Sequence, residues 1–349
     1  MRSLPYVTGL VAALVLTAAV PAAVAVAADG SEVSEVSEVS KVTQGSDGSD
    51  GSDGFTIEDP RITESSGLAA SRAHPGIYWT HNDQDKPRIF GVDSRTGRTV
   101  ATITLRGVGT PRDMEAISVG PDGAVYVGDI GDNLDGSWDH VWIYRFPEPE
   151  KLRDQTVTAT QFDVKYADGA RNAEALMVHP KTGRVYIASK NEDGGGLYEG
   201  PATLRTGQVN VFRRIGEVPW VTDGAFSPDG RELVLRSYFS ARGYEWKDGR
   251  LGADHRVRGP IQGQSESVTY TPDGRTLLFG SEGERSPVEP VAVESDDAGS
   301  GAAEDSAKPG GPGGGAAGGD EGKGGVTMYG VLVLAGAGAL VLALRRRRG

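Results

Sequence analysis

The 349-residue chain has no cysteine. Disulfide bonds, thiolate metal sites and cysteine-based catalysis are therefore excluded, and any folded part must be stabilised by its apolar core. Histidine is scarce, with five residues and no HExxH motif, so a histidine-based zinc centre is not expected. The net charge is −12, and lysine and arginine form no cluster before the last five residues. Nucleic acid is therefore not an expected partner, because binding phosphates requires clustered basic side chains.

What the sequence does contain is a repeat. In each copy a polar or acidic residue and a small residue precede two apolar runs that are joined by a turn, often Pro-Asp-Gly. This pattern is typical of a β-hairpin. The copies are DMEAISVGPDGAVYV, NAEALMVHPKTGRVYI, VTDGAFSPDGRELVL and SESVTYTPDGRTLLF, with a fifth, ESSGLAASRAHPGIYW, that has a looser turn.

The spacing of the repeat predicts the fold. The copies align on Ser66, Glu115, Glu174, Thr222 and Glu266 and lie roughly 50 residues apart, close to the length of one β-propeller blade. We therefore predict an all-β fold with five blades, because six would need shorter blades than this spacing. FTIEDPRI, residues 55–62, is expected to supply the strand that closes the ring and removes its exposed edges.

The two ends of the chain differ in composition from the repeats. Residues 1–27 have the apolar stretch and small-residue site of a secretory signal, with a retained anchor as the alternative. An uncharged stretch before four arginines predicts a membrane helix with a cytoplasmic end, and a cell-wall sorting signal is its alternative. The expected order is signal peptide (1–27), acidic Ser/Gly linker (28–54), propeller (55–294), Gly-rich disordered stalk (295–325), transmembrane helix (326–344) and basic tail (345–349).

The shared acidic position is the main prediction of a site. If the repeat marks the innermost strand of each blade, Glu115, Glu174 and Glu266 converge at one mouth of the ring. Buried carboxylates need a positive partner. Calcium is one, since it prefers oxygen ligands. Ion pairs with Arg112 and Arg171, three residues before two of the glutamates, are another, and a cationic ligand or a catalytic role is the third.

Other residues are weaker indications. Asp129, Asp132 and Asn133 in GDIGDN are either a calcium loop or plain Asx turns. His81 and Asp129 are possible acid–base residues, but no GxSxG elbow accompanies them.

A ligand-binding surface is a separate expectation. Trp220, beside Asp223, is expected to offer an aromatic platform to a ligand, and Arg112 and Arg171 are the basic residues expected nearby.

Together ESSGLAAS, YWTHNDQ, IFGVDSRTG, DMEAISVGPDG and YVGDIGDN resemble exported bacterial β-propellers of the phytase-like, esterase-like and SdiA-regulated groups, and more loosely NHL and WD-type repeats. The resemblance covers roughly residues 60–280. It implies that Glu115, Glu174 and Glu266 begin inner strands near the channel, where several members hold calcium. Ser66 and Thr222 depart from that pattern, and no basic cluster supports phytase chemistry.

The sequence therefore predicts a binding or scaffold module of the cell envelope, extracellular and held by a single membrane span. Its partner would be an envelope protein, a peptide or a small molecule. The alternative is a calcium-dependent hydrolase of an ester, lactone or phosphoester.

Overall fold

The computed structural model describes residues 53–84, 86–134, 136–191 and 194–294. The predicted signal peptide, the stalk, the transmembrane helix and the basic tail lie outside these residues, as does nearly all of the linker. Within the described part of the chain no helix is long and apolar enough to cross a membrane. The regular structure there consists of strands in four sheets.

The strands of each sheet follow one another from the centre outwards. One sheet contains β2 (Ser65–Ala70), β3 (Ile77–Asn82), β4 (Arg88–Asp93), β5 (Arg98–Arg106) and β9 (Gln155–Thr158). Another contains β6 (Met114–Val119), β7 (Ala124–Asp129), β8 (Val141–Pro147) and β10 (Thr160–Tyr166), joined to β14 (Asn210–Val218), β13 (Gly195–Glu199), β12 (Val185–Ser189) and β11 (Ala173–Val178). The others contain β15 (Asp223–Phe226), β16 (Glu232–Arg236), β17 (Ala241–Lys247) and β18 (Arg250–Val257), and β19 (Ser265–Tyr270), β20 (Thr276–Ser281), β21 (Pro287–Ala292) and β1 (Phe55–Thr56).

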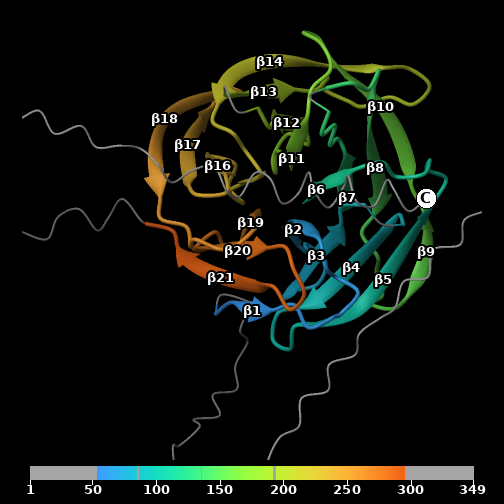
Figure 1. The fold of residues 1–349 in the computed structure, drawn as a ribbon, viewed down its shortest axis with the longest axis vertical. Helices are drawn as coiled ribbons and strands as arrows, with labels where there is room; N and C mark the ends of the chain where they lie inside the picture. Colours follow the sequence, from blue (N-terminus) through green and yellow to red (C-terminus); the bar gives the residue numbers. More distant parts are fainter. Residues whose placement is uncertain (1–52, 85, 135, 192–193, 295–349) are drawn as a thin grey trace, which may run out of the picture. The chain divides into compact units, whose positions relative to one another are not determined.

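The predicted hairpins are the inner part of the fold. In all five repeats the first apolar run pairs antiparallel with the second, as β2 does with β3 and β6 with β7. The first strands contact one another in a closed cycle, β2 to β6 to β11 to β15 to β19 and back to β2. Figure 1 shows β2, β6, β11 and β19 around the centre and β5, β9, β14, β18 and β21 at the periphery. The described residues thus have an all-β fold of sheets around a centre.

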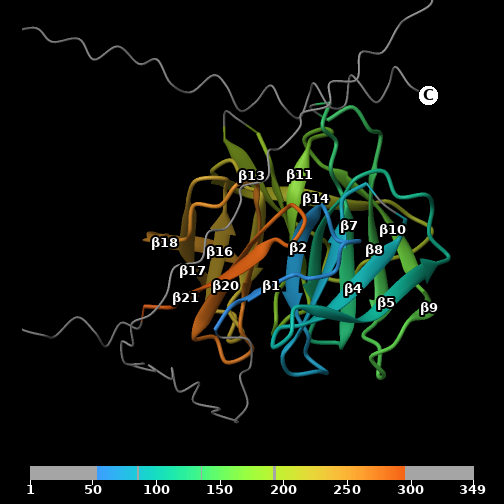
Figure 2. The same ribbon diagram turned by 60° about the horizontal axis from the view of Figure 1, so that its bottom comes forward.

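The ring is closed by the first strand, as predicted. Phe55 pairs with Val288 and Thr56 with Pro287, so β1 becomes the outer strand of the last sheet (Figure 2). Ile57, directly after β1, is 1% exposed and donates its N–H to the carbonyl of Ser286 at 3.0 Å. The beginning and the end of the repeat region are therefore held in one sheet.

One alternating segment of the sequence forms two strands. Residues 157–166 alternate as a single strand would, but the chain divides at the buried Ala159. The part before it, β9, pairs parallel with β5 of the preceding sheet, and the part after it, β10, pairs with β8. β10 also pairs parallel with β14, so the outer strands join neighbouring sheets. The hydrophobic pattern did not reveal this because both halves alternate in the same way.

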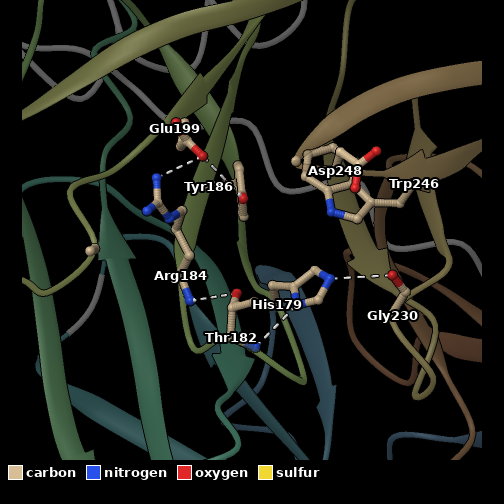
Figure 3. Close-up of a pocket in the computed structure, with 10 residues that line it drawn as sticks. His179, Thr182, Arg184, Tyr186, Glu199, Gly230, Trp246 and Asp248 are labelled. Carbon is tan, nitrogen blue, oxygen red and sulfur yellow. Dashed lines mark hydrogen bonds and ion pairs between the residues drawn. The ribbon is translucent and has the colours of Figure 1, made fainter.

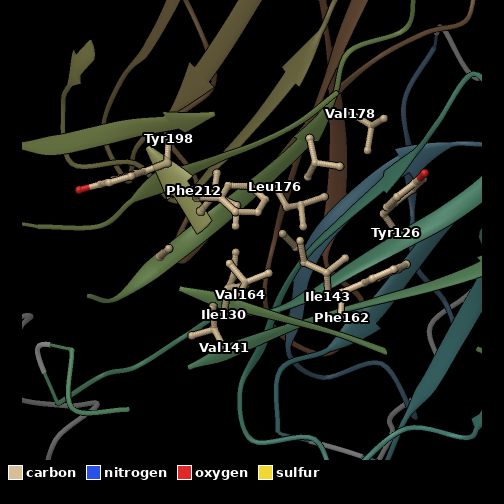
Figure 4. Close-up of a cluster of buried hydrophobic side chains, with 14 of the residues drawn as sticks. Tyr126, Ile130, Val141, Ile143, Phe162, Val164, Leu176, Val178, Tyr198 and Phe212 are labelled. Carbon is tan, nitrogen blue, oxygen red and sulfur yellow. The ribbon is translucent and has the colours of Figure 1, made fainter. Parts of the chain in front are cut away.

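Apolar side chains fill the space between sheets. Figure 4 shows Ile143, Phe162 and Val164 from one half of the eight-stranded sheet against Leu176 and Phe212 from the other half. All five are buried. Each sheet therefore packs face to face on the next, which fixes the positions of the strand ends around the ring.

Gly97 provides a test of the ring closure. It has φ +66°, and a Cβ there would lie 1.9 Å from the carbonyl oxygen of Thr56, at the end of β1. Gly123 has a similar φ of +68° but no atom within 4 Å of its Cβ position. Gly123→Ala should therefore lower the free energy of unfolding by about 1 kcal/mol, through backbone strain alone. Gly97→Ala should lower it by about 2 kcal/mol or more, because β1 must also move. Urea unfolding of both variants measures the difference, and equal losses would show that β1 is not held at this position.

Candidate functional site

The repeated glutamates stand at irregularities of their strands. The register between first and second strand shifts around Glu115 in β6, Glu174 in β11 and Glu266 in β19. Such a β-bulge re-aims the bulged side chain. All three residues are at most 7% exposed. Glu174 and Glu266 raise the pKa of Glu115, and Glu174 also raises the pKa of Glu266. The structure therefore brings these three glutamates together, as the sequence predicted.

A second position of four of the five repeats reaches the same place. A residue one or two positions after the second strand donates its backbone N–H to the carbonyl two positions before the aligned residue of the first strand. This bond joins Asp83 to Glu64, Gly131 to Asp113, Lys190 to Asn172 and Glu282 to Gln264. Three of these four donor residues carry a charged side chain. Sequence reasoning missed Lys190 and Glu282 because the residue type at this position changes from one repeat to the next.

The acidic residues at these two positions, together with Glu64 and Asp113 whose carbonyls accept the bond, form what we call the acidic cluster, namely Glu64, Asp83, Asp113, Glu115, Glu174, Glu266 and Glu282. It has two layers. Asp113, Glu115, Glu174 and Glu266 are buried, while Glu64, Asp83 and Glu282 are half-buried and accessible to solvent. Charge is thus concentrated most strongly where solvent is least able to screen it.

Burial is the first cause of the pKa shifts in the acidic cluster, and repulsion between its carboxylates adds to it. The pKa of Asp113 is raised to about 6, that of Glu174 and of Glu282 to about 7, and that of Glu266 to about 8. Asp83, which shares a hydrogen bond with Glu64, has its pKa raised to about 8, and the pKa of Glu115 lies well above its usual range. Several of these groups therefore hold protons near neutral pH.

Lys190 is the cation of the cluster. Its Nζ donates to Oε1 of Glu174 and, at 2.7 Å, to the hydroxyl of Tyr238. Although burial opposes the charge, Glu174 and Glu266 raise the pKa of Lys190. Among the described residues, Lys190 is the one basic side chain that forms an ion pair with the acidic cluster. One ammonium does not balance seven carboxyls, and Oε2 of Glu174 and Oδ1 of Asp113 remain buried without a hydrogen-bond partner.

Arg112 and Arg171 were predicted to form ion pairs with the glutamates. The ion pair between Lys190 and Glu174 takes their place. The guanidinium of Arg112 lies between the rings of Trp138 and Trp142, 4.1 and 3.8 Å from their centroids. It donates to the carbonyl of His140 at 2.9 Å. Arg171 pairs instead with Asp168 at 3.1 Å. The reason is local: aromatic rings and a nearby carboxylate attract these guanidinium groups before the glutamates do.

The polar residues of the GDIGDN loop, residues 128–133, have different roles. Asp129 accepts from the N–H of Asp113 at 2.8 Å and from the hydroxyl of Tyr144 at 2.5 Å. Asp132 accepts from the hydroxyl of Ser137 and the N–H of Trp138, as in an Asx-type turn. These contacts hold the loop in place.

Asn133 is the member of this loop that reaches the acidic cluster. Its Nδ2 donates to Oδ2 of Asp113 at 2.8 Å, and its Oδ1 accepts from Nδ2 of Asn172 at 3.0 Å. It thereby satisfies one oxygen of Asp113 and leaves Oδ1 without a partner.

His81 and the residues of the fourth repeat differ from the three glutamates in their burial and their contacts. His81 has no exposed surface, and burial lowers its pKa to about 4, so it is neutral and closed to a substrate from solvent. In the fourth repeat Thr222 donates to the carbonyl of Ser265 at 2.8 Å, and Asp223 accepts from the N–H of Val268 at 2.8 Å. Asp223 therefore ties β15 to β19 and lies buried, whereas Trp220 is half-buried and packs on Tyr238.

One hollow lies away from the acidic cluster. It measures about 470 Å³, and Figure 3 shows Trp246 facing Tyr186 and Arg184 across it. Two of its charged groups are already paired with each other, since Arg184 contacts Glu199 at 2.7 Å. Among the described residues no three histidine, aspartate or glutamate side chains are grouped closely enough to hold a metal ion. We therefore take the acidic cluster, with its unpaired oxygens, as the site.

No protein-family profile and no curated protein sequence matches the chain. Solved β-propeller structures are similar to it. A gluconolactonase from Xanthomonas campestris has a TM-score of 0.40 and 15% identity over 68% of this chain and 89% of the other. An aldose sugar dehydrogenase from Streptomyces coelicolor has a TM-score of 0.39 and 13% identity over 68% and 98%. These likenesses are of fold alone, and nothing about the ligand or activity of this chain follows from them.

The raised pKa values predict how stability depends on pH. The folded state binds more protons than the unfolded state between about pH 4.5, the ordinary range of carboxyls, and about pH 8. Its free energy of unfolding must therefore fall as the pH rises through that window. We expect a higher Tm at pH 5.5 than at pH 8.5.

Glu115→Gln keeps the shape of the side chain and removes one ionisable group. It should reduce the difference in unfolding free energy between the two pH values by about 1 kcal/mol or more. Glu217→Gln, at a side chain that is 91% exposed, is the matched control and should leave the difference unchanged. Thermal unfolding at both pH values measures this, and an unaltered pH dependence in Glu115→Gln would contradict the electrostatic account.

Proposed function

We propose that this protein is a five-bladed β-propeller held at the outside of the cell membrane, and that it is a binding module whose acidic cluster receives a cationic ligand. The closed cycle of β2, β6, β11, β15 and β19 supports five blades. The apolar segments at residues 1–27 and 326–344, with the four arginines that follow, support export and a single span. The ligand would then be a protein, peptide or small molecule of the envelope.

The unpaired oxygens of Asp113 and Glu174 carry this proposal. Both side chains are 4% exposed, and Oδ1 of the one and Oε2 of the other have no donor. A buried acceptor without a partner is destabilising, and a buried charge without one is more so. A cation that reaches these oxygens supplies the missing partner and allows neighbouring carboxyls to ionise. Binding should therefore release protons near neutral pH.

A calcium-dependent hydrolase is the second proposal. The unpaired oxygens of Asp113 and Glu174 favour it, whereas the spacing of the described carboxylates does not, because no three of them are grouped closely enough to hold a metal ion. Calcium accepts six to eight oxygen ligands in flexible geometry, and Glu115, Glu174 and Glu266 would be the first of them. In that case calcium would supply a Lewis acid to an ester, lactone or phosphoester. The binding module is the better supported of the two, because Lys190 already lies against Glu174 and because His81 and Asp129 are buried and engaged.

Calorimetric titration of the purified full-length chain tests the binding module. The probes are methylguanidinium, methylammonium and calcium, each in two buffers of different ionisation enthalpy. We expect at least one cation to bind with proton release, and Glu115→Gln or Glu174→Gln to weaken binding at least about tenfold, equivalent to about 1.4 kcal/mol. Glu217→Gln should bind like the unmodified chain.

Two results would contradict the binding module. If no cation binds, or if the glutamine variants bind as tightly as the unmodified chain, the acidic cluster is structural. If calcium binds and the chain then hydrolyses an ester, lactone or phosphoester, with activity lost in Glu115→Gln, the hydrolase replaces the binding module.

A further inference from the structure

An aromatic ledge, consisting of Trp220, Tyr238 and Phe239, adjoins the acidic cluster. The ring centroids of Trp220 and Tyr238 are 5.4 Å apart at 85°, and those of Tyr238 and Phe239 are 6.3 Å apart. Trp220 and Tyr238 are half-buried, whereas Phe239 is 70% exposed. The ledge comes from the segment before β15 and the loop between β16 and β17.

Tyr238 joins the ledge to the carboxyls. Its hydroxyl accepts from Lys190 at 2.7 Å and is hydrogen-bonded to Glu266. The Lys190 ammonium lies 4.8 Å from the ring centroid of Tyr238 and 6.0 Å from that of Trp220. The chain thus already shows, with its own lysine, how this place holds an organic cation: a carboxylate, a phenol and two aromatic rings surround it.

After Lys190 has paired with Glu174, one acceptor oxygen of that carboxylate remains for a second cation. It uses Oε1 of Glu174, while Oε2 of the same carboxylate has no partner. An alkylammonium or guanidinium group satisfies such an oxygen with a directed N–H bond and keeps its contact with an aromatic ring. A hard metal ion such as calcium instead prefers six to eight oxygen ligands, which the rings do not supply. The ledge therefore favours an organic cation over an inorganic one.

The surface beside the ledge is apolar. Phe239 and Ile261 are 70% and 82% exposed, although large apolar side chains are usually buried. The end of β16, three residues before Phe239, is joined to the neighbour of Ile261, since Arg236 donates to Oε1 of Gln262 at 2.7 Å. A free small cation would leave this apolar surface uncovered. A peptide would cover it, because its basic residue is followed by neighbours that reach the surface.

We propose that the occupant of the acidic cluster is a polypeptide segment in which a lysine or arginine stands beside an apolar residue. The basic side chain enters over Tyr238 and pairs with the free oxygen of Glu174, and the apolar neighbour packs on Phe239 and Ile261. This proposal rests on the proposed function, since it names the chemical class of the cationic ligand. The proposed binding is non-covalent, and no bond of either partner is formed or broken.

Fluorescence anisotropy with short labelled peptides and the full-length chain tests the proposal. The first probe has one arginine between two leucines in a Gly/Ser peptide. The second has citrulline in place of arginine, which keeps the shape without the charge. The third has serine in place of both leucines. We expect the first probe to bind at least tenfold more tightly than the second and about fivefold or more better than the third.

Variants at the exposed apolar residues separate the two contributions. Phe239→Ser and Ile261→Ser, at side chains on the surface, should weaken the leucine probe to the level of the serine probe. Ile261→Ser should leave methylguanidinium binding unchanged, because Ile261 is not part of the aromatic ledge. Val209→Ser, at a 43% exposed side chain in the turn before β14, is the matched control and should bind all probes like the unmodified chain.

The outcomes are distinguishable. If the leucine and serine probes bind alike, or if Phe239→Ser and Ile261→Ser change neither, the peptide proposal is wrong and the ligand is a small cation, with the binding module intact. If the citrulline probe binds as well as the arginine probe, the charge is not recognised and the peptide proposal is wrong. If neither a peptide nor methylguanidinium binds, the proposed function fails together with it.

Discussion

The closure of the strand cycle is the constraint on which the rest of the structure depends. The acidic cluster exists only because strands far apart in the sequence begin side by side around one centre. The cycle is completed when β1 pairs with β21, which brings residues from the two ends of the repeat region into one sheet. Apolar packing between sheets then offsets the repulsion between the carboxylates. The core is therefore what allows so much negative charge to be gathered in one place.

Much of the fold could be predicted from the sequence because each hairpin is specified locally. Alternating apolar runs and a turn are enough to indicate β2 with β3 or β19 with β20, and the repeat length indicates a ring. The shared position of Glu115, Glu174 and Glu266 likewise followed from the alignment. The division of residues 157–166 between two sheets could not be predicted, since it depends on which edge strand lies nearby.

The partners of the glutamates could not be predicted for a related reason. Arg112 is close to Glu115 in sequence, but its guanidinium lies between Trp138 and Trp142, and this sandwich forms only in the folded sheet. Lys190 lies sixteen residues after Glu174 and reaches it because their strands pair. The bulges that aim the glutamates are also invisible in a hydrophobic pattern, because one extra residue barely changes it.

The fourth repeat breaks the symmetry of the ring. β15 pairs with β16 without a register shift, Thr222 is used to bind β19, and the aromatic ledge stands over this sector of the ring. Five equivalent repeats would present a ligand with five equivalent orientations, and a bound polypeptide could then leave in any direction. Two repeats lack the glutamate, at Ser66 and Thr222, and the aromatic ledge accompanies the second of them. The ring therefore has a polarity, and the polypeptide segment proposed above would be held there in a single direction.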